Sequence, residues 1–564
     1  NRSAAPFSKF TLTRLTTHGK AASAVISPDG KYVVHVLGPV EQQSLWLRHI
    51  ATGSDKEIVP SNGSGISSLS FSPDGNHICF VRSESREVVL DEVPVLGGPT
   101  KILIRDIDTA ATFSPDGKKL AFVRGDPSRA EASLIIANAD GTEERKLVTH
   151  HADDFFFVTA GTPAWSPDGD KIAISLRGSG TGAAYRNVTA VQVSDRTEKE
   201  ITFEKWNIID SICWLPDGSG LLITAIEPER RNTQVWYASY PHGAVRRLTN
   251  DLNNYQDISV TADGRSAVTV LSEGTSDIWI APEGEASSAS QITSNRFDGL
   301  SGIAWTPDGK IVHGSNVSGT RDLWIMNADG SEDRQLTSNA GLNLSPSVSP
   351  DGRYIAFMSN RAGPMNMWRM DLDGSNQKQL TPGSHDFFPR WTIDNQVIFF
   401  SGAEGQTSVW KVPISGENPV RLTNYTSIAL AVSPTDGKIA IGFSDFSDKA
   451  KPGRQRTGVI APDGGAPIRV FDFPEFFGTL SNGYYGQRIA WTVDGKALTY
   501  LDTKDGVSNI WSQPIDGSPK RQLTNFKSDL IFNYAWSRDG KKLALARGSK
   551  TSDVVLIRDS TEQR

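Results

Sequence analysis

The chain has 564 residues, of which 38% are hydrophobic, and its formal net charge is −6. This length and composition predict a large globular protein of two domains, each of about 280 residues. The negative charge argues against nucleic acid as a partner of this portion, and no apolar run approaches the roughly 20 residues that a membrane span needs.

The first predicted element, Arg14-Leu15-Thr16, resembles the last strand of a repeat rather than the first. After it, a short run ends in a Ser-Pro-Asp-Gly-like turn twelve times, and most turns recur every 42 to 52 residues. The turn aspartates are Asp29, Asp74, Asp116, Asp168, Asp217, Asp263, Asp308, Asp351, Asp394, Asp436, Asp494 and Asp539. The residues that enter the turns are all apolar: Ile26, Phe71, Phe113, Trp165, Trp214, Val260, Trp305, Val348, Trp391, Val432, Trp491 and Trp536. Such a period of short strands is typical of a β-propeller.

Each repeat predicts four strands. An inner strand leads into a turn such as Trp165-Ser166-Pro167-Asp168-Gly169, where proline presets φ, aspartate bonds to its own backbone and glycine takes a positive φ. An alternating second strand follows, as in residues 118–123, then a third strand that often carries tryptophan, and a fourth that ends like Arg247-Leu248-Thr249. Thirteen of the fourteen tryptophans lie on inner or third strands, so we interpret them as repeated packing positions.

The repeats therefore predict an all-β chain of two consecutive propellers with six four-stranded antiparallel blades each, since rings usually hold four to eight blades. We expect Arg14-Leu15-Thr16 to close blade six beside Ile278-Trp279-Ile280, and Gln291-Ile292-Thr293 to close blade twelve beside Val554-Val555-Leu556. The small residues of 282–290 place the domain boundary near Ala286, which gives domains of 1–285 and 286–564. A division into seven and five blades is the alternative.

Enzyme signatures are missing from the sequence. It contains no G-x-S-x-G, no G-x-x-x-x-G-K-[ST], no H-E-x-x-H and no C-x-x-C. Cys79 and Cys213 fall on blades two and five, and we expect them to pack in the core without forming a disulfide. The sequence thus predicts no catalytic residue, no cofactor and no metal in this portion.

Binding residues are expected in the long loops on one face of the rings, because long loops are often functional. Trp206 is the one tryptophan outside the inner and third strands and could be a binding platform, with burial against its own loop as the alternative. The candidates for ligand or partner binding are His150, Asp153, Asp154, Phe156, Trp206, His385, Asp386, Phe387, Phe476, Phe477, Tyr484 and Tyr485. The aromatic members could instead plug the channels or cover blade edges. A metal at His150, His151, Asp153 and Asp154 is conceivable from the ligand types, but their spacing matches no metal-site template.

The Ser-Pro-Asp-Gly turns and Leu-Thr strands resemble those of the TolB-type propeller family. The departures from that pattern are local: Ala262, Ile393, Val493 and Arg538 replace proline, Thr435 is inserted, and Asn395 replaces glycine. Three further segments resemble the C-terminal propeller region of bacterial receptor-type serine/threonine kinases. They are Ser44–Arg48, Val93–Gly98 and Tyr534–Gly548.

The kinase resemblance implies a non-catalytic sensor or interaction module on the periplasmic side, tethered to the inner membrane through a segment ahead of Asn1. A chain that starts at Asn1 without methionine fits this expectation. The ligand, whether protein, peptide or small molecule, stays open. Three alternatives remain: the sensor region of a winged-helix regulator of the CadC type, a free periplasmic scaffold similar to TolB, and a lyase or hydrolase that works at the channel mouth.

Overall fold

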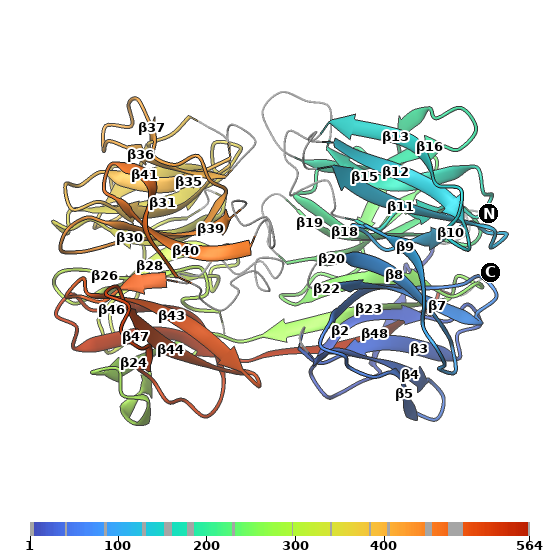
Figure 1. Ribbon diagram of the computed structural model, residues 1–564, viewed down its shortest axis with the longest axis horizontal. Coiled ribbons are helices and arrows are strands. Elements are labelled where there is room, and N and C mark those ends of the chain that lie inside the picture. The colour runs from blue at the N-terminus through green and yellow to red at the C-terminus, as the bar shows by residue number, and fades with distance from the viewer. Residues whose placement is uncertain are drawn as a thin grey trace. The chain divides into compact units, whose positions relative to one another are not determined.

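The chain folds into two units built from four-stranded antiparallel sheets (Figure 1). One unit runs to Glu273 and resumes at Lys550, and the other spans Gly274–Ser549; we call them unit 1 and unit 2. The computed structural model describes residues 5–39, 42–83, 87–126, 131–151, 161–177, 185–227, 232–295, 297–338, 341–382, 385–402, 407–445, 454–471 and 489–561. These residues form twelve sheets, six in each unit, which confirms the predicted fold class.

Unit 1 has six blades, which we number in chain order of their inner strands. Blades 1 to 3 are β2 (Ala21–Ile26), β3 (Tyr32–Leu37), β4 (Ser44–His49), β5 (Asp55–Val59); β6 (Gly65–Phe71), β7 (His77–Ser83), β8 (Val88–Pro94), β9 (Lys101–Arg105); and β10 (Thr112–Phe113), β11 (Lys119–Asp126), β12 (Glu131–Asn138), β13 (Arg145–His151). Blades 4 to 6 are β14 (Ala164–Trp165), β15 (Lys171–Arg177), β16 (Arg186–Gln192), β17 (Glu198–Glu200); β18 (Ile208–Trp214), β19 (Gly220–Ile226), β20 (Gln234–Ser239), β21 (Val245–Arg247); and β22 (Asn254–Val260), β23 (Ser266–Gly274), β48 (Lys550–Asp559), β1 (Phe10–Arg14).

Unit 2 repeats the pattern. Its blades 1 to 3 are β26 (Ile303–Trp305), β27 (Ile311–Ser315), β28 (Asp322–Met326), β29 (Arg334–Gln335); β30 (Asn343–Val348), β31 (Tyr354–Ser359), β32 (Asn366–Asp371), β33 (Lys378–Gln379); and β34 (Asp386–Trp391), β35 (Val397–Ser401), β36 (Ser408–Val412), β37 (Val420–Arg421). Its blades 4 to 6 are β38 (Ser427–Val432), β39 (Ile439–Asp445), β40 (Arg454–Ala461), β41 (Gly464–Phe471); β42 (Ile489–Trp491), β43 (Ala497–Lys504), β44 (Val507–Pro514), β45 (Arg521–Gln522); and β46 (Leu530–Trp536), β47 (Lys542–Gly548), β24 (Asp277–Pro282), β25 (Ser290–Gln291). A short 3-10 helix, η2 (Ala286–Ser288), lies between β24 and β25.

The closing strands differ from the prediction. β1 pairs with β48, with Leu12 opposite Ile557, whereas β25 pairs with β24, with Gln291 opposite Trp279. The third strand of the last blade in each unit therefore follows a strand of the other unit in the sequence. The chain passes from β23 in unit 1 to β24 in unit 2, and later from β47 in unit 2 to β48 in unit 1 (Figure 1). The predicted pairings of Arg14-Leu15-Thr16 and Gln291-Ile292-Thr293 are wrong, and the units divide after Glu273 rather than near Ala286.

The chain does not reverse direction at either crossover, β23 to β24 or β47 to β48. Only Ser549 separates β47 from β48, and a hairpin needs at least a two-residue loop. β48 therefore continues away from β47 instead of folding back onto it. The two crossovers run side by side, because the Thr275 N–H donates to the Ser549 carbonyl at 2.9 Å.

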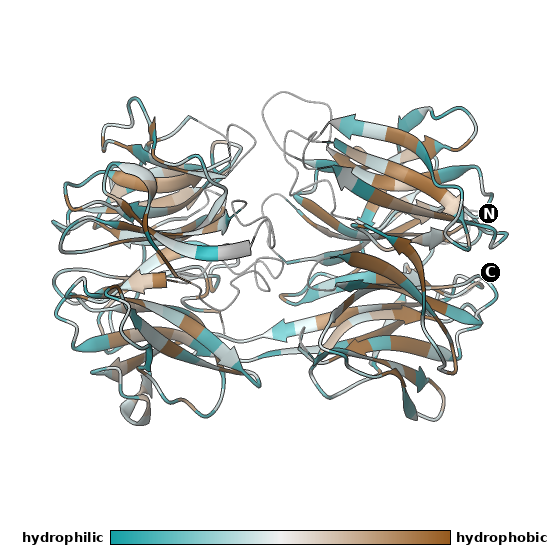
Figure 2. Ribbon diagram, in the orientation of Figure 1, coloured by the Kyte–Doolittle hydropathy of each residue, from teal (hydrophilic) through white to brown (hydrophobic). Residues whose placement is uncertain are grey.

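The core of each unit lies between neighbouring blades, and Figure 2 shows hydrophobic segments along the strands. Each unit has six such clusters, and in each the last cluster joins blade 6 to blade 1. In unit 1 this cluster packs Ile26 and Val33 against Val554 and Leu556, so β48 belongs to the ring-closing core. Inner-strand tryptophans add polar links between blades: the Trp305 indole N–H of unit 2 donates to the Ala535 carbonyl at 2.9 Å.

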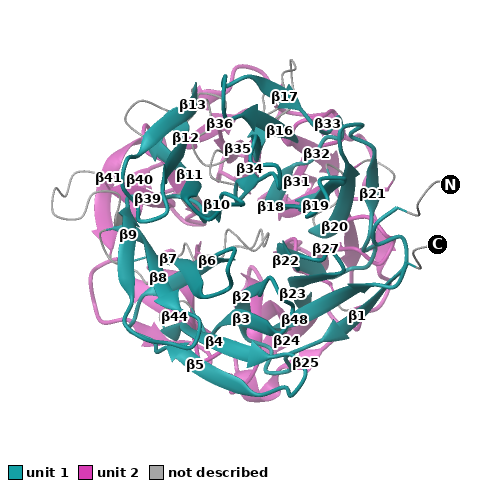
Figure 3. Cartoon of the chain, turned by 90° about the vertical axis from the view of Figure 1, so that its right-hand side faces the viewer, with its two compact units in different colours: residues 1–180, 184–273, 550–564 teal, residues 181–183, 274–549 magenta. Residues whose placement is uncertain are grey.

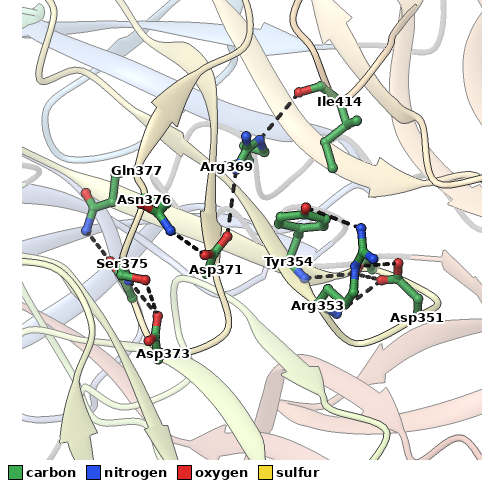
Figure 4. A network of polar contacts seen from close by, with 12 residues as sticks. Asp351, Arg353, Tyr354, Arg369, Asp371, Asp373, Ser375, Asn376, Gln377 and Ile414 are labelled. Atoms are coloured by element: carbon green, nitrogen blue, oxygen red, sulfur yellow. Dashed lines mark hydrogen bonds and ion pairs between the residues drawn. The ribbon is translucent and has the colours of Figure 1, made fainter.

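The recurrent turns are held by side-chain hydrogen bonds, as predicted. In the turn of blade 2 of unit 2, Asp351 accepts from the Ser349 hydroxyl at 2.6 Å and from the Arg353 N–H at 3.1 Å (Figure 4). Asp373, between the third and fourth strands of the same blade, accepts from the N–H and the hydroxyl of Ser375. In unit 1, hydrogen bonds from Ser72 and Asn76 hold the pKa of Asp74 down to about 2.

The threonine that ends each Leu-Thr strand has a structural role. In eight of the described blades its hydroxyl accepts the N–H of a third-strand residue at 2.9 to 3.1 Å. The threonine and N–H pairs are Thr16–Val554, Thr202–Val188, Thr249–Val235, Thr293–Ile278, Thr337–Leu323, Thr381–Met367, Thr423–Val409 and Thr524–Ile510. The hydroxyl thus replaces a strand partner where the fourth strand ends, and the motif needs no ligand to explain it.

Candidate functional site

The channel of unit 1 holds a cavity of about 260 Å³. All six inner strands surround it, and Figure 3 shows this unit as a ring with its inner strands toward the middle. The lining includes the six apolar residues that enter the turns, namely Ile26, Phe71, Phe113, Trp165, Trp214 and Val260. It also includes hydroxyl side chains and one carboxylate, Asp257. The lining thus combines apolar and polar surface, and polar groups placed in a concave site are what orients a ligand.

Asp257 is held in place by the neighbouring blade. Its residue has a φ of 55° at a bulge of β22, a conformation that aspartate tolerates. Its Oδ2 accepts the Ser23 hydroxyl at 2.6 Å and the Ala24 N–H at 3.2 Å. These bonds join blade 6 to blade 1 and fix the carboxylate at the channel wall.

A second carboxylate, Asp210, supports Asp257 from blade 5. Its Oδ2 accepts the backbone N–H of Asp257 at 3.0 Å and the Thr224 hydroxyl at 3.2 Å. Burial, together with the charge of Asp210, raises the pKa of Asp257 to about 7, and burial also raises the pKa of Asp210. Burial disfavours the ionised form of both carboxylates, the charge of Asp210 adds to this effect at Asp257, and such perturbed groups often mark functional sites.

The pKa of Asp257 predicts a pH-dependent stability. Because the folded-state pKa is raised, the contribution of this group to stability is present below about pH 4 and is lost as the pH rises through 7. We expect the thermal midpoint of the wild type to fall over this interval, and Asp257→Asn to remove this part of the slope and raise the midpoint at pH 8. Thermal unfolding from pH 4 to 8 measures it.

Asp74→Asn is the matched control in the same unit. The pKa of Asp74 is lowered to about 2, so its stabilising contribution is constant above pH 4 and is lost only as the pH falls toward 2. Asp74→Asn should therefore lower the midpoint without changing the slope between pH 4 and 8. An Asp257→Asn protein with the wild-type slope would contradict the assignment.

The two cysteines are free, as predicted, and Cys213 also lines the cavity. Burial raises the pKa of the Cys213 thiol to about 12 and raises that of Cys79 as well. Both groups are therefore protonated at neutral pH, and a thiol in this state is a poor nucleophile.

The sequence-predicted residue Trp206 is not available to a ligand. Its side chain has 0% exposure and packs edge-to-face against Trp236, with ring centroids 6.1 Å apart. Its backbone exchanges hydrogen bonds with Arg186 at 2.7 and 3.1 Å. The prediction of a binding platform is therefore wrong, and the alternative of burial is correct, because the loop folds its indole into the core between blades 4 and 5.

His150 lies on β13, the outermost strand of its blade, rather than in a channel-face loop. Its Nε2 is 3.1 Å from Glu198 Oε1 on the outermost strand of the next blade. His150 thus sits at the rim of unit 1, away from the inner strands that form the cavity. Its role in binding a partner stays a prediction.

His385, Asp386 and Phe387 lie at the start of the inner strand β34 of unit 2. Asp386 is 1% exposed and accepts the hydroxyl of Thr381, and burial raises its pKa. The rings of His385 and Phe387 are 6.5 Å apart. Asp386 is thus part of the polar packing of its blade, whereas His385 and Phe387 are half-buried.

The remaining predicted residues lie outside the described residues: Asp153, Asp154, Phe156, Phe476, Phe477, Tyr484 and Tyr485. Their binding roles, and the expected absence of a metal at His150, stay predictions. Where the structure is described, no group of three histidine, cysteine or acidic side chains is placed to share a metal ion.

Sequence reasoning missed Asp210 and Asp257. Both sit in inner strands, which the repeat pattern treats as packing positions, and their proximity depends on two bulges. A usable signal was an aspartate in the inner strands of two consecutive repeats, four residues before Trp214 and three residues before Val260, where most other repeats have apolar or small residues.

The twelve four-stranded blades, and the strands that complete the last blade of each ring, define this chain as a double β-propeller. The family model of the TolB beta propeller domain matches residues 109–301 and 265–435, so the chain belongs to this family. No helix among the described residues has both the length and the apolar character that a bilayer crossing requires.

Two curated relatives match parts of the chain. The Tol-Pal system protein TolB of Anaeromyxobacter dehalogenans is 28% identical over 165 residues, which are 29% of this chain and 36% of the relative. Dipeptidyl-peptidase 5 of Porphyromonas gingivalis is 34% identical over 118 residues, which are 20% of this chain and 17% of the relative. The matched segments thus span 36% of the first relative and 17% of the second.

Two solved structures that match the chain are TolB from Acinetobacter baumannii and the tricorn protease. The TolB structure is 14% identical, with 61% of this chain and 77% of that chain covered and a TM-score of 0.27. The tricorn protease is 11% identical, with 93% and 60% covered and a TM-score of 0.33.

Proposed function

We propose that this chain is a non-catalytic binding module on the extracytoplasmic side of a bacterial membrane, and that unit 1 recognises a basic group of a protein or peptide partner in its channel. The observation that carries the proposal is a fixed carboxylate, Asp257, in the wall of a 260 Å³ cavity. Membership of the TolB propeller family and the match to a Tol-Pal system protein support the extracytoplasmic setting.

A cationic side chain suits this cavity chemically. A lysine or arginine has an apolar stem that can lie against Phe71, Phe113 or Trp165 and a charged head that can reach Asp257. A cation near Asp257 favours its ionised form, so binding releases a proton and strengthens as the pH rises through about 7. The hydroxyls of the lining can accept the remaining N–H donors.

A peptide library with free basic and acidic residues tests the proposal. Wild-type protein at pH 8 should select peptides that contain lysine or arginine, and Asp257→Asn should weaken the best of them about tenfold or more, as expected for a charge-assisted hydrogen bond. Asp217→Asn is the control, because Asp217 is an exposed turn residue of the same unit and the charge change is equal. Selection of acidic or neutral peptides, or unchanged binding by Asp257→Asn, would sink the proposal.

We propose more specifically that this module is the sensor region of a membrane-bound receptor-type serine/threonine kinase. Its support is the resemblance of Ser44–Arg48, Val93–Gly98 and Tyr534–Gly548 to that family. Sequencing the coding DNA upstream of the Asn1 codon tests it. Kinase motifs followed by an apolar span of about 20 residues would support it, whereas a winged-helix domain or a bare signal peptide would replace it with a transcriptional sensor or a free periplasmic scaffold.

A further inference from the structure

One inner-strand position distinguishes the two channels. It is the residue immediately before the one that enters each turn, and in unit 1 all six residues at this position line the cavity. Across the chain the position holds Val25, Ser70, Thr112, Ala164, Cys213, Ser259, Ala304, Ser347, Arg390, Ala431, Ala490 and Ala535. Eleven of the twelve residues are small or medium-sized and uncharged, and Arg390 alone is long and charged.

Arg390 lies on β34 of unit 2, and the other five blades of that unit provide only alanine or serine at its level. By the correspondence with unit 1, these six residues face the channel of unit 2. The small neighbours leave room near the axis for the guanidinium. The channel can hold one side chain as long as arginine because the other five blades place only small side chains at this level.

The guanidinium of Arg390 has no carboxylate partner among the described residues. Its terminal N–H donates to the adjacent Pro389 carbonyl at 2.8 Å, and its Nε–H is inaccessible to solvent and makes no hydrogen bond in the described structure. The titratable neighbour that acts on its pKa is Tyr534, on β46, three blades from β34 in a ring of six. Burial raises the pKa of Tyr534 so that its phenol is neutral at neutral pH, and it therefore gives Arg390 no counter-charge.

The surroundings favour an anionic ligand. Burial lowers the pKa of Arg390 to about 10, so the side chain is still a cation at neutral pH. An unpaired, desolvated cation is costly, and the free donors of a guanidinium match the two oxygens of a carboxylate or phosphate. We propose that the channel of unit 2 binds a small oxyanion, a carboxylate or a phosphate, on the guanidinium of Arg390.

Thermal unfolding of the full chain in acetate or inorganic phosphate, at ionic strength held constant with sodium chloride, tests this site. A tenfold excess of the bound anion over its dissociation constant should raise the midpoint of the wild type by about 3–6 °C. Arg390→Met should abolish the rise, and Arg390→Lys, which keeps the charge but loses the two-pronged geometry, should retain part of it. Arg353→Met is the control, because Arg353 is 69% exposed and belongs to the same unit.

The two anions separate the sources of the ligand. A response to acetate alone identifies a carboxylate, a response to phosphate alone identifies a phosphate, and either supports the site if Arg390→Met removes it. The proposal is overturned if neither anion stabilises the wild type, or if both variants of Arg390 respond as the wild type does. Far-UV circular dichroism of each variant verifies that it is folded, and if Arg390→Met does not fold, Arg390→Lys alone decides.

Discussion

Residues 274–549, expressed alone, should fold and unfold cooperatively, whereas residues 1–273 should not. The first fragment contains all strands of unit 2, including β24 and β25. The second lacks β48, whose buried residues Val554, Val555, Leu556 and Ile557 contribute about 1.5–3 kcal/mol each. Their loss is comparable to the total stability of a domain, about 5–15 kcal/mol. Circular dichroism and thermal unfolding of both fragments measure this difference.

Adding residues 550–564 to the second fragment is the control. Fused through a short linker to Glu273, this segment should restore a cooperative transition, because β48 pairs with β1 and packs against blades 5 and 1. The fragments 1–285 and 286–564 test the opposite division. If both folded independently, β24 would be able to replace β48, and the observed closure would not be required for stability.

Trp206→Ala should lower the free energy of unfolding by about 3–5 kcal/mol, the usual cost of emptying a large aromatic site in a core. The indole is fully buried and contacts the cluster that holds blades 4 and 5 together. We expect the variant to bind basic peptides like the wild type at temperatures where it is folded, because Trp206 does not line the cavity. Chemical denaturation and peptide titration separate the two effects.

Trp46→Ala is a suitable comparison in the same unit. Trp46 is on a third strand, is only partly buried, and donates its indole N–H to Ser44 at 2.9 Å. The loss of stability should be smaller than for Trp206→Ala. Equal losses, or a selective loss of peptide binding by Trp206→Ala, would return Trp206 to the list of binding residues.

The sequence predicts the blades well because their determinants are local. Ser, Asp and Gly in a turn such as 27–30 form hydrogen bonds within five residues, and apolar alternation sets each strand's faces. The closing strands could not be predicted in the same way. Ile278-Trp279-Ile280 and Val554-Val555-Leu556 have equivalent patterns, so the pattern alone does not decide which unit each joins.

The candidate sites were less predictable for a related reason. Asp257 and Asp210 come together through bulges in two strands, which no spacing rule in the sequence reports. Trp206 was the opposite case, since an isolated tryptophan in a loop has no periodic pattern to indicate burial. Arg390 could have been found by comparing the twelve repeats position by position, because it alone departs from small, uncharged residues.

The pairing of β1 with β48 also sets an order of assembly during synthesis. A ribosome produces the first 273 residues with five complete blades and an unfinished sixth, and then the whole of unit 2, before it makes β48. Unit 2 can therefore complete its ring first, although it is encoded second. Until β48 emerges, β1 and the open edge of β23 have no partner, and this interval is when a chaperone would need to protect the first ring.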